Sequence, residues 1–155
     1  MRVKGTVFSG FERGKDLMAK WGNRLTGMLG FKPFAGTLNV RLTEEVDMEI
    51  RAEKKLEHLL INGKPKVEAY LAPATLTSLA GSEQCWAMRQ TEDVYPKNVV
   101  ELLSSVNLRE KLKLKDGDEV GIELTDAFRK TKVPGFGIFQ KIMMKTGKND
   151  DKNNG

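Results

Sequence analysis

Two neutral side chains that carry oxygen atoms lie two residues apart in FKPFAGTLNVRL, residues 31–42. Apolar and polar residues alternate from position 38 onward, as is typical of a strand with one buried face. Thr37 and Asn39 therefore lie together on its other face. Such oxygens bind a divalent ion weakly, but they can help to bind Mg²⁺ when phosphate oxygens and water complete its coordination. Judged from the motif alone, a structural interpretation is slightly favoured, in which Thr37 is a plain strand residue and Asn39 a local turn former.

A second candidate is SGFERGKD, residues 9–16, which follows a predicted strand and precedes a predicted helix. Glycines let a backbone approach an anion, and the N-terminus of the helix adds free N–H groups and a favourable dipole. The segment is not a Walker A motif, because three residues rather than four separate its glycines and an Asp follows its Lys. Taken alone, it is better explained as an ordinary strand-to-helix turn.

Three further polar residues lie in the second half of the chain. Glu101 interrupts the apolar run VVELL, so its carboxylate points either to solvent or into a site. Asn107 is a good N-cap residue for the helical turn NLREKL, and Arg109 next to it supplies a cation. Both suit a nucleotide phosphate or a base edge. A surface ion pair of Arg109 with Glu110 or Glu119 is the alternative.

The elements that must position these residues are mostly short strands. An Asn-Gly pair at 62–63 and an Asp-Gly pair at 116–117 predict tight turns between them. The predicted strands are RVKGTVFS, the stretch from Gly36 to Leu42, KVEAYLAPATL, EQCWAMR, VVELLSS and the alternating strand with Val120, Ile122 and Leu124. Several short strands with few helices favour a small β-barrel over a doubly wound sheet.

Helices are few in this pattern. KDLMAKWGNRLTGMLG places an apolar residue at every fourth position, which predicts one helix with a single apolar stripe. Gly30 follows its last turn, where a glycine commonly ends a helix. The segment from Glu53 to Leu60 is interpreted as a short helix, and NLREKL as a helical turn.

The composition is that of a soluble, single-domain protein of 155 residues, with 39% hydrophobic and 30% charged residues. A lone Cys85 excludes an internal disulfide, and His58 as the single histidine excludes a zinc cluster. No apolar run is long enough to span a bilayer, and MRVKGTVFSG lacks the apolar core of a signal peptide. We therefore expect a cytoplasmic protein in a reducing compartment, without membrane association.

The net charge of +5 is concentrated at the C-terminal end. Residues 126–155 hold seven basic and three acidic residues, a net charge of +4, which leaves +1 for the 19 basic and 18 acidic residues before them. Such a nearly neutral body argues against a nucleic-acid-binding surface. The expected organisation is a barrel domain over residues 1–125 and a basic, partly disordered extension over residues 126–155.

Taken in order, these segments resemble one family, the archaeal-type CTP-dependent riboflavin kinases. The matching stretches are SGFERGK, LGFKPFAGTLNVRL and YPKNVVELLSSVNLREKLKLKDGDEVGIEL, within roughly residues 3–125. The resemblance implies a mainly β fold, a small six-stranded cradle-loop (RIFT-like) barrel with one or two short helices. It also implies transfer of the γ-phosphate of CTP to the 5′-hydroxyl of riboflavin, which gives FMN and CDP.

The resemblance further implies roles for individual residues. Thr37 and Asn39 would bind Mg²⁺, and Glu101 would contact the flavin and is the candidate catalytic residue. Thr91 is chosen as the second flavin contact, because the strict family spacing falls on Asp93 and Thr91 is the nearest threonine. The CTP/CDP site would be formed by two segments, the first with Gly10, Phe11, Glu12, Arg13, Gly14 and Lys15 and the second with Val106, Asn107, Leu108 and Arg109.

The first of these segments departs from the family pattern Gly-x-Gly-Glu-Gly. Glu12 replaces the middle glycine and Arg13 replaces the expected Glu, so a side chain occupies a position where backbone should approach the nucleotide. Two alternatives follow: a non-catalytic barrel that binds flavin, nucleotide or DNA, and a riboflavin kinase that uses another nucleotide. A monomeric enzyme acting on riboflavin and CTP is the main expectation.

Overall fold

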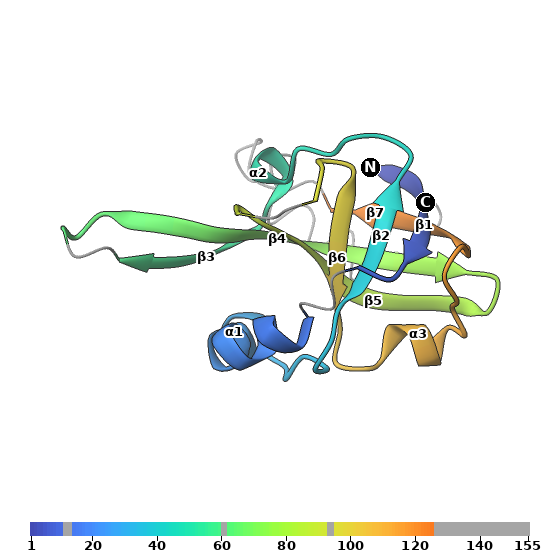
Figure 1. Cartoon of the computed structure of the whole chain (residues 1–155), viewed down its shortest axis with the longest axis horizontal. Coiled ribbons are helices and arrows are strands. Elements are labelled where there is room, and N and C mark those ends of the chain that lie inside the picture. Colours follow the sequence, from blue (N-terminus) through green and yellow to red (C-terminus); the bar gives the residue numbers. More distant parts are fainter. Residues whose placement is uncertain (11–13, 60–61, 93–94, 126–155) are drawn as a thin grey trace, which may run out of the picture.

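Six antiparallel strands form a closed ring in the computed structural model, which describes residues 1–10, 14–59, 62–92 and 95–125. The ring runs β4-β5-β6-β2-β1-β7, and β7 pairs again with β4 (Figure 1). This arrangement confirms the predicted mainly β, six-stranded barrel. The ring strands are β1 (Arg2–Phe8), β2 (Leu38–Leu42), β4 (Pro65–Ser78), β5 (Gly81–Gln90), β6 (Val99–Leu103) and β7 (Glu119–Leu124).

A further strand, β3 (Lys54–Leu59), lies outside the ring and pairs with the first half of β4. The prediction of a short helix over residues 53–60 is therefore wrong. The Asn62-Gly63 turn returns the chain on itself, with Gly63 at φ +80° and the Asn62 side chain accepting from the backbone N–H of Lys64. Hairpin pairing with β4, together with complete burial of Leu56 in the cluster that includes Leu25 of α1, outweighs the helix propensity of the Glu, Lys and Leu residues.

Three helices occur among the described residues, α1 (Gly14–Leu29), α2 (Met48–Arg51) and α3 (Leu108–Lys111). The long helix α1 ends as predicted, because Gly30 has a φ of +82° and its N–H donates to the carbonyl of Thr26. The short helix α2 was not predicted; the side chain of Asp47 caps it. The expectation of few helices is confirmed, and α1 corresponds to the helix predicted from KDLMAKWGNRLTGMLG.

The interior of the ring is the main hydrophobic core. Every second residue of β2 contributes to it, which confirms the predicted alternation of buried and accessible positions. Asn39 and Arg41 consequently lie on the outer face of the ring. The core is completed by Val3, Val7, Ala72, Ala74, Leu76, Val100, Leu102, Leu108, Val120 and Ile122.

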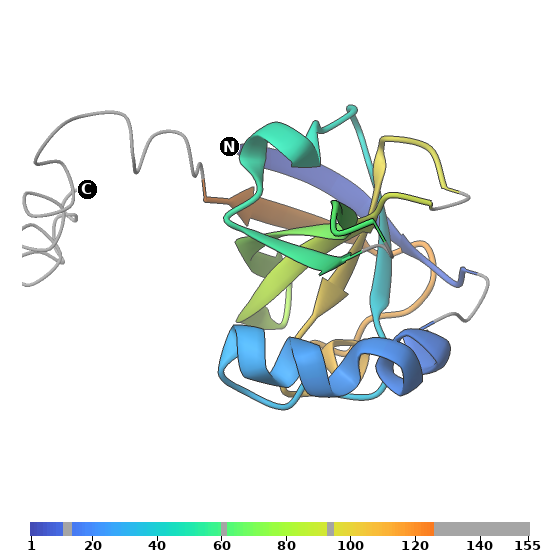
Figure 2. The same cartoon turned by 90° about the vertical axis from the view of Figure 1, so that its left-hand side faces the viewer.

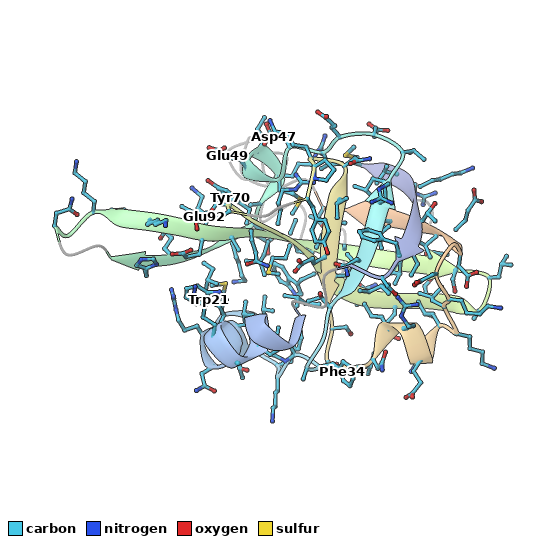
Figure 3. The ribbon with its side chains drawn as sticks, viewed as in Figure 1. Trp21, Phe34, Asp47, Glu49, Tyr70 and Glu92 are labelled. Carbon is cyan, nitrogen blue, oxygen red and sulfur yellow. The ribbon has the colours of Figure 1, made fainter. Side chains whose placement is uncertain are left out.

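A second core lies outside the ring, between α1 and the outer face of the neighbouring strands (Figure 2). Leu25 of α1 is fully buried against Leu56, Leu71, Met88 and Leu103. Trp21 packs beside them and points from α1 toward the β3–β4 hairpin in Figure 3. The predicted apolar stripe of α1 is therefore the contact that holds this helix to the barrel, and one edge of the outer face is covered by it.

Cys85 is buried in β5, as expected for a cysteine that only packs. Burial raises the pKa of its thiol to about 12, with a smaller contribution from Glu83. On the order of 10⁻⁴ of such a thiol is ionised at pH 8, and the thiolate is the reactive form. We expect an aromatic disulfide reagent to label the native protein extremely slowly at pH 8 and one thiol per chain after denaturation. Rapid labelling of native protein would contradict the packing of β5.

The extension at residues 126–155 lies outside the described residues, so its boundary with the barrel remains a prediction. Within the described part of the chain, no helix is both long enough and apolar enough to cross a membrane.

Candidate nucleotide and flavin site

Asn39 and Glu101 lie directly opposite each other on neighbouring strands. The register of β2 and β6 pairs these two residues. The register of β1 and β2 pairs Asn39 with Phe8, and the register of β5 and β6 pairs Glu101 with Met88. Directly opposed residues share one face, with Cβ atoms about 5 Å apart. The predicted metal ligand and the predicted flavin contact therefore meet on the outer face of the ring, although 62 positions separate them in the sequence.

Glu101 is held in a buried position, with only 2% of its surface exposed. Every residue of β6 is buried, because its interior face packs in the ring and its outer face is covered by further elements. The Nε2 atom of Gln90 on β5 lies 3.5 Å from Glu101 Oε1. Arg89, next to Gln90, donates to backbone oxygens of Val46, Lys97 and Val99 and so fixes the chain that enters β6. Of the two orientations left open for Glu101, the structure therefore shows the one away from bulk solvent.

Gly10 contacts the same outer face through its backbone. A Cβ at this position would overlap the hydroxyl of Tyr95 and would lie 2.6 Å from Asn39 Nδ2, so only glycine fits without displacement of these side chains. Phe8 orients Tyr95 by an edge-on ring contact with centroids 5.7 Å apart. The start of the first predicted nucleotide segment is thus placed beside Asn39. Tyr95 was missed as a site residue, because only the fold brings it to Gly10.

The second predicted nucleotide segment lines a cavity of about 170 Å³ together with Thr37. Val106, Asn107, Leu108 and Arg109 form one side of it, and residues 34–38 form the other. Gly36 has a φ of +150°, a backbone conformation that favours glycine, and this explains the glycine just before β2. Phe34 is 40% exposed at this cavity and lies between α1 and α3 in Figure 3. Its accessible ring was not predicted as part of a site.

Two local interactions shape the second segment. The Asn107 side chain accepts from the backbone N–H of Glu110 at 3.2 Å, which confirms Asn107 as the N-cap of α3. Arg109 pairs with Asp116 at 3.0 Å, and not with Glu110 or Glu119 as the alternative proposed. The N-cap and the ion pair thus hold the start of α3, which lines the cavity, and connect it to the turn at Asp116.

The other predicted residues are less closely grouped. Thr91 lies just after β5, where its hydroxyl donates to the carbonyl of Val67 at 2.9 Å, so only its lone pairs can serve a ligand. Gly14 and Lys15 begin α1. Phe11, Glu12 and Arg13 lie outside the described residues, so the departure from the family pattern remains a statement about the sequence.

The donors at Thr37 and Asn39 fit a hard cation that is shared with a nucleotide. Both side chains offer neutral oxygens, and Thr37 lines the cavity beside residues 106–109. No group of three or more His, Cys, Asp or Glu side chains that could hold a metal exists in the described ranges. A cation at Thr37 and Asn39 would therefore depend on phosphate oxygens and water for its remaining ligands, as Mg²⁺ commonly does.

A larger cavity of about 820 Å³ lies elsewhere, between the β4–β5 hairpin and the start of β7. Its lining includes Lys4, Leu79, Lys113 and Val120 but no residue that the sequence assigned to a site. Size alone favours this larger cavity, yet the residues that the family resemblance assigns to the nucleotide and the metal, Thr37 and residues 106–109, line the smaller one. We therefore place the site at the smaller cavity and at the adjoining outer face of β2 and β6.

The described strands form a closed β-barrel, and the candidate site comprises the outer face at Asn39 and Glu101 and the cavity beside Thr37. The family model of the CTP-dependent riboflavin kinases, described as domain of unknown function DUF120, matches residues 7–124. The chain therefore belongs to the CTP-dependent riboflavin kinase family, an enzyme family, which confirms the resemblance found in the sequence.

Curated relatives named riboflavin kinase support the same assignment. The protein of Saccharolobus solfataricus is 33% identical over 139 residues, which cover 80% of this chain and 74% of the relative. The protein of Sulfurisphaera tokodaii is 33% identical over 134 residues, covering 80% and 95%. The protein of Sulfolobus acidocaldarius is 34% identical over 134 residues, covering 80% and 81%. Each similarity thus spans most of both chains.

Proposed function

We propose that this chain transfers the γ-phosphate of CTP to the 5′-hydroxyl of riboflavin and releases FMN and CDP. One observation carries the proposal. Residues from three separate parts of the sequence meet on the barrel, because Thr37 shares a cavity with residues 106–109 and Asn39 pairs with Glu101. A nucleotide bound in that cavity would present its phosphates toward the acceptor hydroxyl at Glu101.

Phosphoryl transfer needs alignment and charge neutralisation more than covalent chemistry. In the proposed complex, residues 106–109 and the first segment from Gly10 to Lys15 bind the nucleotide. Thr37 and Asn39 hold Mg²⁺, which supplies charge neutralisation for the phosphates when bound. Glu101 orients the 5′-hydroxyl of the ribityl chain toward the γ-phosphate.

Burial of Glu101 supports a role at the acceptor substrate. A carboxylate that is 2% exposed strongly favours a hydrogen-bond donor, and a ribityl hydroxyl is such a donor. Its position opposite Asn39 supports the proposal, because a phosphoryl group held near Asn39 and a hydroxyl held at Glu101 would lie on one face of the sheet. Thr91 remains the proposed second flavin contact, through the lone pairs of its hydroxyl.

Turnover of riboflavin with CTP, ATP, GTP and UTP tests this function. We expect FMN to form with CTP at a kcat/KM at least about tenfold above that with each other nucleotide. The four reactions are followed by separation of FMN from riboflavin, with Mg²⁺ present and with a chelator as the control. A preference for another nucleotide would overturn the choice of CTP. Formation of no FMN from any of them would overturn the kinase proposal and favour a binding module.

A further inference from the structure

Asp116 connects the two segments that the proposed function assigns to the nucleotide. The hydroxyl of Ser9, directly before the first segment, donates to Asp116 Oδ2 at 2.7 Å. The Nη1 atom of Arg109, in the second segment, lies 3.0 Å from Asp116 Oδ1. One oxygen of this carboxylate therefore binds Ser9, beside the first segment, and the other binds Arg109 in the second segment. Ser9 and Arg109 are far apart in the sequence.

The backbone around Asp116 is fixed relative to β1. Gly117, with a φ of +94°, donates its N–H to the carbonyl of Val7 at 2.8 Å, and Val7 donates its own N–H to the carbonyl of Asp118 at 2.9 Å. The turn is closed by Asp118, whose side chain accepts from the backbone N–H of Lys115 at 2.8 Å. The carboxylate of Asp116 consequently extends from a turn that is tied to β1 by backbone hydrogen bonds.

The carboxylate of Asp116 is ionised at neutral pH. The hydrogen bond from Ser9 lowers its pKa most, and the hydrogen bond and charge of Arg109 lower the pKa further. Because the guanidinium has several N–H groups and the bridge engages Nη1, Arg109 is oriented while donors remain for a ligand. The bridge thus reduces the freedom of a long side chain before binding, which lessens the entropy cost of binding.

We propose that Asp116 is a positioning residue for the nucleotide: it holds Ser9 and Arg109 so that both segments are arranged before CTP binds. The inference rests on the proposed function, because that function identifies the two segments as nucleotide-binding. Asp116 acts through its two partners and has no assigned contact with the reacting atoms.

The test compares Asp116→Asn with Asp118→Asn. Both variants remove one carboxylate from the same turn, but only Asp116 contacts Ser9 and Arg109 through its side chain. For Asp116→Asn we expect the Kd for CDP, measured by calorimetry, and the KM for CTP to rise about tenfold, since a charge-assisted bridge is lost. Its kcat and its KM for riboflavin are expected to stay within about twofold of the wild-type values. Asp118→Asn is expected to lower the Tm but to raise the Kd for CDP by less than about twofold, because the backbone hydrogen bonds of Val7 with Gly117 and Asp118 still hold the turn.

Ser9→Ala provides a second variant that separates positioning from stability. It should weaken CDP binding less than Asp116→Asn, and the double variant should match Asp116→Asn, because both substitutions break one bridge. Equal nucleotide affinity of Asp116→Asn and wild type, or an equal loss in Asp118→Asn, would overturn the inference. Wild-type protein that binds CDP but forms no FMN would overturn the proposed function alone. Wild-type protein that binds no CDP would overturn both.

Discussion

Asn39→Ala is expected to reduce Mg²⁺-dependent turnover of riboflavin by about 100-fold or more, because the phosphates lose their alignment with the acceptor hydroxyl. Asn39 lies half-buried on the outer face of the barrel, beside Gly10 and opposite Glu101. Its loss removes a neutral oxygen from a weak metal site and no side chain from the interior core. The measurement is kcat for FMN formation over a range of Mg²⁺ concentrations.

Asn98→Ala is the matched control for this prediction. Asn98 is also an asparagine beside β2, where it donates to the carbonyl of Leu42 at 3.3 Å, but it does not line the cavity. We expect both variants to melt within a few degrees of the wild type, and only Asn39→Ala to weaken Mn²⁺ binding in the presence of CDP. Near-wild-type turnover of Asn39→Ala, or unchanged Mn²⁺ binding, would contradict the metal assignment.

Glu101→Gln is expected to lower kcat by about 100-fold or more, since the side chain keeps its size but loses the charge that orients the acceptor hydroxyl. The folded barrel should tolerate the change well. A buried carboxylate is costly to desolvate, and an amide of the same shape removes that cost while it retains hydrogen-bonding capacity. We therefore expect a Tm equal to or above that of the wild type.

Two further measurements define the role of Glu101. Glu119→Gln on β7 is the control, because it removes an exposed carboxylate far from the cavity lining and should leave kcat unchanged. The pH profile of kcat separates the two possible contributions of Glu101: an acid limb in the wild type that is absent from Glu101→Gln indicates proton acceptance, and a uniform loss at all pH values indicates orientation alone. Wild-type activity of Glu101→Gln would contradict both contributions.

Local patterns in the sequence determined much of the fold. The alternation in β2, the apolar stripe of α1, the stop at Gly30, the turn at Asn62-Gly63 and the N-cap at Asn107 all occur as predicted. Each of these features depends on backbone geometry or on contacts between residues close in sequence. The types and spacing of the side chains therefore indicate such features directly. The family was likewise recognisable from the order of a few short segments, whereas the site residues that the resemblance implies remain predictions.

Only the tertiary structure decided how the site is assembled. The strand register placed Asn39 beside Glu101, and packing placed Tyr95 against Gly10 and Asp116 between Ser9 and Arg109. Residues 54–59 form a strand because they pair with β4 across the nearby Asn62-Gly63 turn, which their helix-forming composition did not indicate. The contacts of Asn39 with Glu101, of Tyr95 with Gly10 and of Asp116 with Ser9 join residues that are far apart in sequence, so no local pattern encodes them. Closure of the ring determines these contacts, because it fixes the registers of all ring strands together.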